Sequence, residues 1–171
     1  MKRNILRAAV AASILGVSGV AFADDAEIPF QGTIQELCTL TAGSITQGTI
    51  ALADTLGQTD RLTARPNETS NGTLGNFAYT CRAGNANLTV NAPVGTNPTA
   101  QALEAVPGYI EGANIYSDAA GATSIAATDT TATANAQPSG TYYVSMWAET
   151  TGTDILGGTY NYTVTVNIVD N

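Results

Sequence analysis

The sequence contains no histidine and only two cysteines among its 171 residues. Without histidine no Ser-His-Asp or Cys-His catalytic arrangement can form, and zinc sites built on histidine are excluded as well. The fourteen acidic residues are scattered, and their spacing alone places no two of them in one cleft. We therefore expect no enzymatic activity, no catalytic residue, no metal site and no cofactor.

Basic residues are also few, and three of the six lie at the N-terminus, at positions 2, 3 and 7. An apolar stretch over residues 8–20 follows, and Ala21-Phe22-Ala23 fits the small-x-small pattern of a signal-peptide cleavage site. The sequence therefore predicts a signal peptide at residues 1–23 and export through the periplasm. The alternative is a retained anchor, but this stretch is shorter and richer in alanine than the roughly 20 strongly apolar residues of a membrane span.

The remaining chain is strongly acidic. Three arginines and fourteen acids give it a net charge of 3 − 14 = −11, and its length is 171 − 23 = 148 residues. Such a charge repels nucleic acid phosphates and anionic lipids, and no second apolar run reaches membrane length. We expect one domain that neither binds nucleic acid nor inserts into a membrane.

Residues that favour long helices are scarce, whereas β-branched residues, glycine and asparagine are common, which is typical of strands and turns. Alternating segments predict strands at residues 27–36, 39–52, around Leu62, 76–81, 87–90, 109–116, 141–149 and 159–169. Residues 96–107 are read as irregular and residues 122–139 as an exposed loop with at most one weak strand. Strands this short, without helices, predict an all-β, antiparallel two-sheet sandwich of immunoglobulin type.

Cys38 and Cys81 are expected to form a disulfide, because the export compartment is oxidising. A reactive thiol pair or half a metal site would need a nearby histidine or further cysteines. On the segment 141–149, Tyr143 and Trp147 are predicted to lie in the core. The alternative for Trp147, the only tryptophan, is a platform on which a sugar stacks.

The final segment has the clearest alternation in the sequence: one face carries Tyr160, Tyr162, Val164, Val166 and Ile168. It ends close to the chain terminus, which predicts an open apolar edge of the kind that proteins usually cover. The alternative is an ordinary last strand paired on both sides. A second alternator, with Ile28, Phe30, Gly32 and Ile34 on one face, starts the mature chain. A free strand at one end and an open edge at the other predict head-to-tail strand addition and a filament.

These features together resemble the subunits of chaperone–usher pili (fimbrial pilins). The matching motifs are the extension 24–37 leading into Cys38, the Cys38–Cys81 spacing, Asn114–Asp118 with Gly121, Tyr142–Ala148, and the segment 158–169. The resemblance depends on the order and spacing of these motifs and covers essentially the whole mature chain. Pro29 inside the extension and the C-terminal residues Val169-Asp170-Asn171, which lack the usual aromatic, depart from the pilin pattern.

The resemblance implies an incomplete immunoglobulin-like sandwich at residues 38–171 that lacks its last strand. A neighbour's donor-strand extension at residues 24–37 would complete it, with Ile28, Phe30, Gly32 and Ile34 inserted beside the final strand. The implied partners are identical or related pilin subunits, a periplasmic chaperone and an outer-membrane usher. The implied role is a structural subunit of a cell-surface fimbrium that supports adhesion, in either the typical or the archaic, spore-coat-like branch. The alternative function is a self-contained secreted β-sandwich that binds a carbohydrate or acts as an adhesin module.

Overall fold

The computed structural model describes residues 38–82, 84–128 and 134–170. All of these residues belong to one compact unit. The predicted signal peptide and the predicted donor-strand extension lie outside the described residues.

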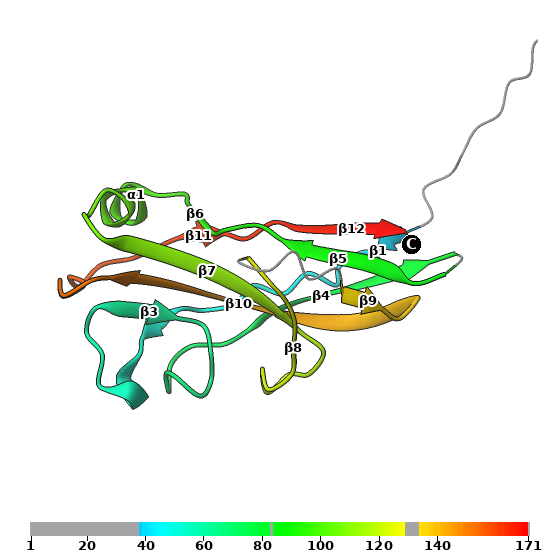
Figure 1. The fold of residues 1–171 in the computed structure, drawn as a ribbon, viewed down its shortest axis with the longest axis horizontal. Helices are drawn as coiled ribbons and strands as arrows, with labels where there is room; N and C mark the ends of the chain where they lie inside the picture. The colour runs from blue at the N-terminus through cyan, green and yellow to red at the C-terminus, as the bar shows by residue number, and fades with distance from the viewer. Residues whose placement is uncertain (1–37, 83, 129–133, 171) are drawn as a thin grey trace, which may run out of the picture. The chain divides into compact units, whose positions relative to one another are not determined.

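The larger of the antiparallel sheets has seven strands (Figure 1). Its longest strand, β10, pairs along one edge with β4 and then with β3, and along the other edge with β7. Strand β1 pairs with β4, β2 with β3, and β8 with β7. The seven strands are β1 (Cys38–Leu40), β2 (Ala51–Leu52), β3 (Arg61–Thr63), β4 (Gly75–Cys81), β7 (Tyr109–Tyr116), β8 (Ser124–Ala127) and β10 (Ser139–Thr150).

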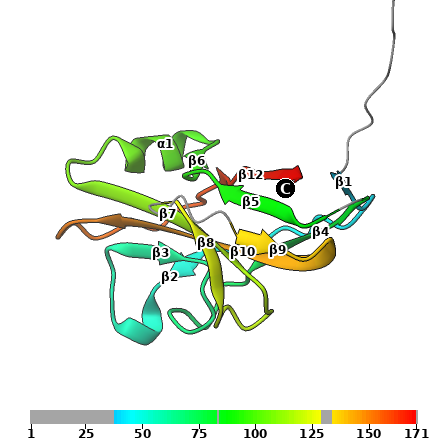
Figure 2. The same cartoon turned by 45° about the vertical axis from the view of Figure 1, so that its right-hand side comes forward.

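A smaller sheet has the order β12-β5-β9, formed by β12 (Val166–Asp170), β5 (Ala86–Val90) and β9 (Ala134–Ala136). A short pair, β11 (Tyr162–Thr163) with β6 (Val94–Gly95), continues β12 and β5 along the chain. Figures 1 and 2 show β5 and β12 lying over β4 and β10. The predominance of antiparallel strands therefore agrees with the sequence-based prediction.

One hydrophobic cluster joins the two sheets. The larger sheet contributes Phe77, Tyr79 and Tyr142, whose rings stack with centroids 5.5–6.3 Å apart. The smaller sheet contributes Leu88 and Val90, which are buried in the same cluster. Because each buried apolar side chain of this size stabilises a fold by about 1.5–3 kcal/mol, this shared cluster is what holds the sheets together.

The predicted disulfide between Cys38 and Cys81 is confirmed. The two residues are direct partners in the pairing of β1 with β4. The bond closes a loop with a sequence separation of 43 residues, which on the chain-entropy account stabilises the fold by about 4 kcal/mol.

A helix, α1 (Pro98–Glu104), lies where the sequence was read as irregular. The side chain of Asn97 accepts a hydrogen bond from the Ala100 N–H at 3.1 Å, and proline occupies the first turn. Both are standard signals for the start of a helix, so the prediction of a chain without helices was wrong. A 3₁₀ turn, η1 (Asp54–Leu56), also occurs. In the part of the chain that the structure describes, no helix is long and apolar enough to cross a membrane.

The prediction that Tyr143 and Trp147 lie in the core was wrong. The core face of β10 carries Tyr142, Met146 and Ala148, which are buried, whereas Tyr143 and Trp147 lie on the opposite face and are half-buried. Successive side chains of a strand point to opposite faces, and two adjacent tyrosines left the choice of face ambiguous. The residues 122–139 read as loop also contain β8 and β9, whose Ala126 and Ala136 are small enough to be buried between strands.

Candidate functional site

A strip of half-buried apolar side chains follows the last part of the chain. Tyr162, Val164, Val166 and Ile168 all pack against the cluster between the sheets while keeping part of their surface exposed. The structure thus brings together four of the five residues predicted for this face. Tyr160 is half-buried as well, but it packs in a second cluster with Leu62, Leu103 and Ile155. We call the four side chains the apolar strip.

The backbone along this strip has one paired edge. The N–H of Asn91 donates to the carbonyl of Thr165 at 2.9 Å. The same register continues along β12, so the backbone N–H and C=O groups of its odd-numbered residues point toward β5. In an antiparallel pair the backbone groups of successive residues point alternately to the two edges. The N–H and C=O groups of Val166 and Ile168 therefore point to the other edge of β12, and no strand within the described ranges pairs there.

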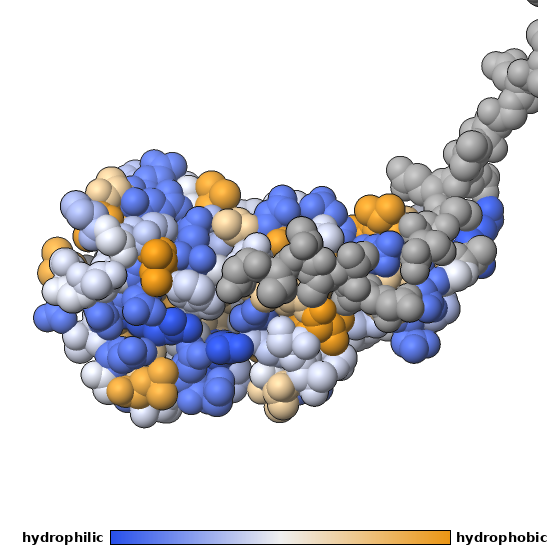
Figure 3. All heavy atoms as spheres, viewed as in Figure 1, coloured by the Kyte–Doolittle hydropathy of each residue, from blue (hydrophilic) through white to orange (hydrophobic). Residues whose placement is uncertain are grey.

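Strand β1 lies next to this open edge (Figure 1). Among the described residues β1 pairs only with β4, so its second edge is open too. Cys38 of β1 packs against the same cluster as the strip. Figure 3 shows apolar side chains, in orange, reaching the surface at separate places among polar ones. Two open edges, one from each sheet, thus flank apolar side chains that are only partly covered.

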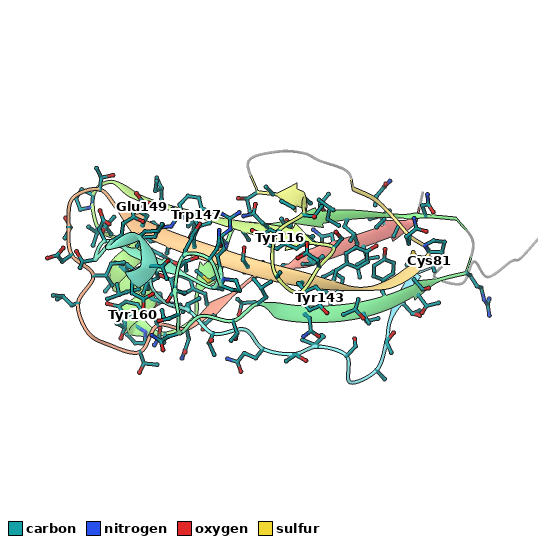
Figure 4. All side chains as sticks on the ribbon, turned by 90° about the horizontal axis from the view of Figure 1, so that it is seen from below. Cys81, Tyr116, Tyr143, Trp147, Glu149 and Tyr160 are labelled. Carbon is teal, nitrogen blue, oxygen red and sulfur yellow. A yellow bond between two sulfur atoms is a disulfide. The ribbon has the colours of Figure 1, made fainter. Side chains whose placement is uncertain are left out.

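A cavity of about 400 Å³ lies at one end of the molecule. It is lined by Ile50, Leu52, Leu62, Ile155, Leu156 and Tyr160, together with Ala51, Gly157, Gly158 and Thr159. The hydroxyl of Tyr160 donates a hydrogen bond to the Leu156 carbonyl at 2.7 Å, which fixes these two lining residues relative to each other. Figure 4 shows Tyr160 and Cys81 at opposite ends of β10, so the cavity lies at the end away from the disulfide. This cavity was not predicted from the sequence, and the apolar pair Ile155-Leu156 between two predicted strands was the missed signal.

The strip and the cavity carry no formal charge. Burial raises the pKa of Tyr162, so its hydroxyl stays protonated at neutral pH. In the described part of the chain no group of acidic residues or cysteines is placed to hold a metal ion. The arrangement is therefore suited to an apolar, extended segment that offers both backbone hydrogen bonds and side chains.

An ionic cluster covers the face of β10 that points away from the core between the two sheets. Glu68 accepts from both Arg61, at 3.2 Å, and Arg65, at 2.8 Å. Arg61 also donates to Glu149 at 2.7 Å, and its guanidinium lies 4.7 Å from the ring centroid of Trp147. Figure 4 shows Trp147 and Glu149 side by side on β10. Because the guanidinium occupies one side of the indole, this ring is not a free platform for a sugar.

Glu68 is the buried centre of this cluster, with 7% of its surface exposed. Burial alone would raise the pKa of its carboxyl group, but hydrogen bonds from Arg65 and Thr63 and the charges of the two arginines outweigh burial and lower it. The ionised form is therefore favoured in the folded protein. Stability from this group is present above the ordinary pKa of 4.5 and is lost as the pH falls below it.

We predict that Glu68→Gln lowers the free energy of unfolding at pH 7 by about 1.5–3 kcal/mol, because two charge-assisted hydrogen bonds weaken. The variant should also lose less stability than the parent between pH 5 and pH 3, as followed by urea unfolding at each pH. Glu149→Gln is the matched control: its side chain is 25% exposed and holds one ion pair, so it should cost about 1 kcal/mol or less. Parallel pH profiles for parent and Glu68→Gln would contradict this role.

Gly112 on β7 lies directly under Trp147. A Cβ at this position would be 2.8 Å from three indole atoms, whereas at Gly157 it would meet nothing within 4 Å. Gly112→Ala should therefore displace the indole, lower stability by about 1–3 kcal/mol and shift the fluorescence of the single tryptophan. Gly157→Ala should change neither quantity. Unchanged fluorescence in Gly112→Ala would show that the indole does not rest on this glycine.

No model of a known protein family matches the sequence, and no curated protein resembles it significantly.

Proposed function

We propose that this protein is a structural, non-enzymatic subunit of a bacterial surface fimbrium and that it polymerises head to tail by donor-strand exchange. One observation carries the proposal: the open edge of β12, with its apolar strip, lies beside the open edge of β1. An exposed apolar edge of this kind is a site for strand addition. Addition between identical copies does not close and so produces a filament.

The order of the strands supports an immunoglobulin-like sandwich that lacks its last strand. The larger sheet contains the path β1-β4-β10-β7, which corresponds to the order A-B-E-D of that fold. The pair of β5 with β12 corresponds to strands C and F. Strand G of the complete fold would pair with the edge of β12 that is open among the described residues.

In this reading a neighbouring copy supplies strand G from residues 24–37. A strand antiparallel to β12 would run toward the cavity, so Ile28 and Phe30 would cover the apolar strip and Ile34 would reach the cavity end. Gly32 would leave room for close approach of the backbones. Pro29 cannot donate a ladder hydrogen bond, so it would have to turn its nitrogen away from a partner.

The open edge also supports the inferred partners. A subunit with an uncovered apolar edge aggregates unless another protein occupies that edge, which is the role we assign to a periplasmic chaperone before an outer-membrane usher assembles the fibre. The disulfide agrees with passage through an oxidising compartment. We infer that the assembled protein lies at the cell surface and supports adhesion.

The proposal predicts a ladder of multimers when the purified protein is run on a denaturing gel without heating, and a single monomer band after boiling. The ladder arises because release of the inserted strand requires opening of the core between the sheets. A self-contained binding module would run as one species under both conditions. That outcome in freshly exported protein would contradict the fimbrial role.

A further inference from the structure

The short connection between the proposed donor strand and Cys38 limits how far apart two joined copies can be. Only three residues, 35–37, separate Ile34 from Cys38. Four residue steps (38 − 34 = 4) span at most about 14 Å even when fully extended. If Ile34 of one copy reaches the cavity end of its neighbour, the disulfide end of the first copy must lie within that distance.

The cavity end of the acceptor copy exposes apolar side chains. Leu156 is 78% exposed and Leu52 is 37% exposed, and both lie at the rim of the cavity. These two leucines therefore remain available to the body of the incoming copy.

The disulfide end of the donor copy exposes apolar side chains as well. Leu40, two residues after Cys38, is 51% exposed, and Val169 on the neighbouring β12 is 59% exposed. The two ends cannot meet within one copy. Strand β10 runs from one end to the other and measures their separation. At the disulfide end, Gly140 of β10 pairs with Tyr79, which is also the partner of Leu40. At the cavity end, Ala148 of β10 pairs with Leu62. Eight residues of β10 therefore separate the ends by about 26 Å.

We propose that Leu40 and Val169 of each copy contact Leu52 and Leu156 of the copy that receives its strand. The contact buries exposed apolar surface at both ends and makes the joint between subunits a packed interface instead of a free hinge. This inference rests on the proposed function, because the short connection brings the two ends together only if residues 24–37 are the donor strand.

The test compares side-chain accessibility in two polymers of the full-length exported chain by hydroxyl-radical labelling and mass spectrometry. One polymer has the natural connection, and the other carries an insertion of about eight Gly and Ser residues between Glu36 and Leu37, which relaxes the limit on distance. We expect Leu40 and Leu156 to be labelled several-fold faster in the lengthened polymer. Val166 and Ile168, which the donor strand itself covers, should be protected equally in both.

Equal labelling of Leu40 and Leu156 in the two polymers would overturn the contact between the ends, while protection of Val166 and Ile168 would still support the donor strand. Labelling of Val166 and Ile168 that is as fast in the polymer as in monomer would overturn the proposed function itself. A second variant, Leu40→Ser in the natural chain, should form polymers in which Leu156 is labelled several-fold faster. Unchanged labelling of Leu156 there would also overturn the contact.

Discussion

Removal of residues 24–34 should abolish polymerisation, and addition of a peptide of residues 24–37 should then raise the melting temperature by about 10 °C or more. The peptide would bury Ile28, Phe30 and Ile34 beside the apolar strip, which at about 1.5–3 kcal/mol each gives roughly 5–9 kcal/mol. Part of this is lost to ordering of the peptide. Size-exclusion chromatography measures the polymerisation, and calorimetry or circular dichroism measures the melting temperature.

A peptide that carries Phe30→Asp and Ile34→Asp is the matched control, because it keeps the length and backbone while losing the apolar contacts. It should leave the melting temperature of the shortened chain almost unchanged. Polymers of normal length from the shortened chain, or equal stabilisation by both peptides, would contradict the role of residues 24–34 as the donor strand.

Two chains that cannot polymerise alone should form dimers when they are mixed. Val166→Asp places a charge in the apolar strip and should prevent a donor strand from binding, whereas Ile34→Asp impairs the donor strand and leaves the strip intact. The Val166→Asp chain can then donate to the Ile34→Asp chain, but no third copy can join at either end. Light scattering on the separated mixture should show a species of twice the monomer mass.

Asn167→Asp is the control for Val166→Asp, because residue 167 is on the exposed face of the same strand. It adds the same charge one residue away and should polymerise normally. Circular dichroism establishes that the Val166→Asp chain is folded. Long polymers in the mixture, or the same loss of polymerisation in Asn167→Asp, would show that assembly does not depend on the apolar strip.

Much of the strand pattern could be predicted because alternation is a local property of the chain. The predicted strand at residues 109–116 has the same bounds as β7, and the predicted disulfide joins β1 to β4. Helix α1 was missed because its seven residues are too short to show an amphipathic pattern, although Asn97 and Pro98 carry the signal for its start. The face of β10 was misjudged because Tyr142 and Tyr143 are adjacent aromatics. Only the packing of the smaller sheet, with Leu88 and Val90, against one face of β10 decides which of the two is buried.

The sequence predicted the apolar strip along the last strand, but it did not predict the cavity at the end of that strand. The face of Tyr162, Val164, Val166 and Ile168 follows from period-two alternation, and the structure places all four against one cluster. The cavity depends on residues far apart in the sequence, from Ile50 to Tyr160, which tertiary contacts bring together. The ionic cluster likewise needs Arg61, Glu68 and Glu149 from three separate segments, and no local pattern links them.

The ionic cluster has a consequence for a protein exposed to digestive proteases. Trypsin-like enzymes cleave after lysine or arginine, and the described residues contain only three such positions, at Arg61, Arg65 and Arg82. The bond after Arg65 precedes a proline, which these enzymes do not cleave. The bond after Arg61 lies inside β3, where strand pairing and the two salt bridges keep the backbone out of a protease cleft. The paired and salt-bridged backbone at Arg61, together with the proline after Arg65, therefore withdraws two of these three cleavage points from attack.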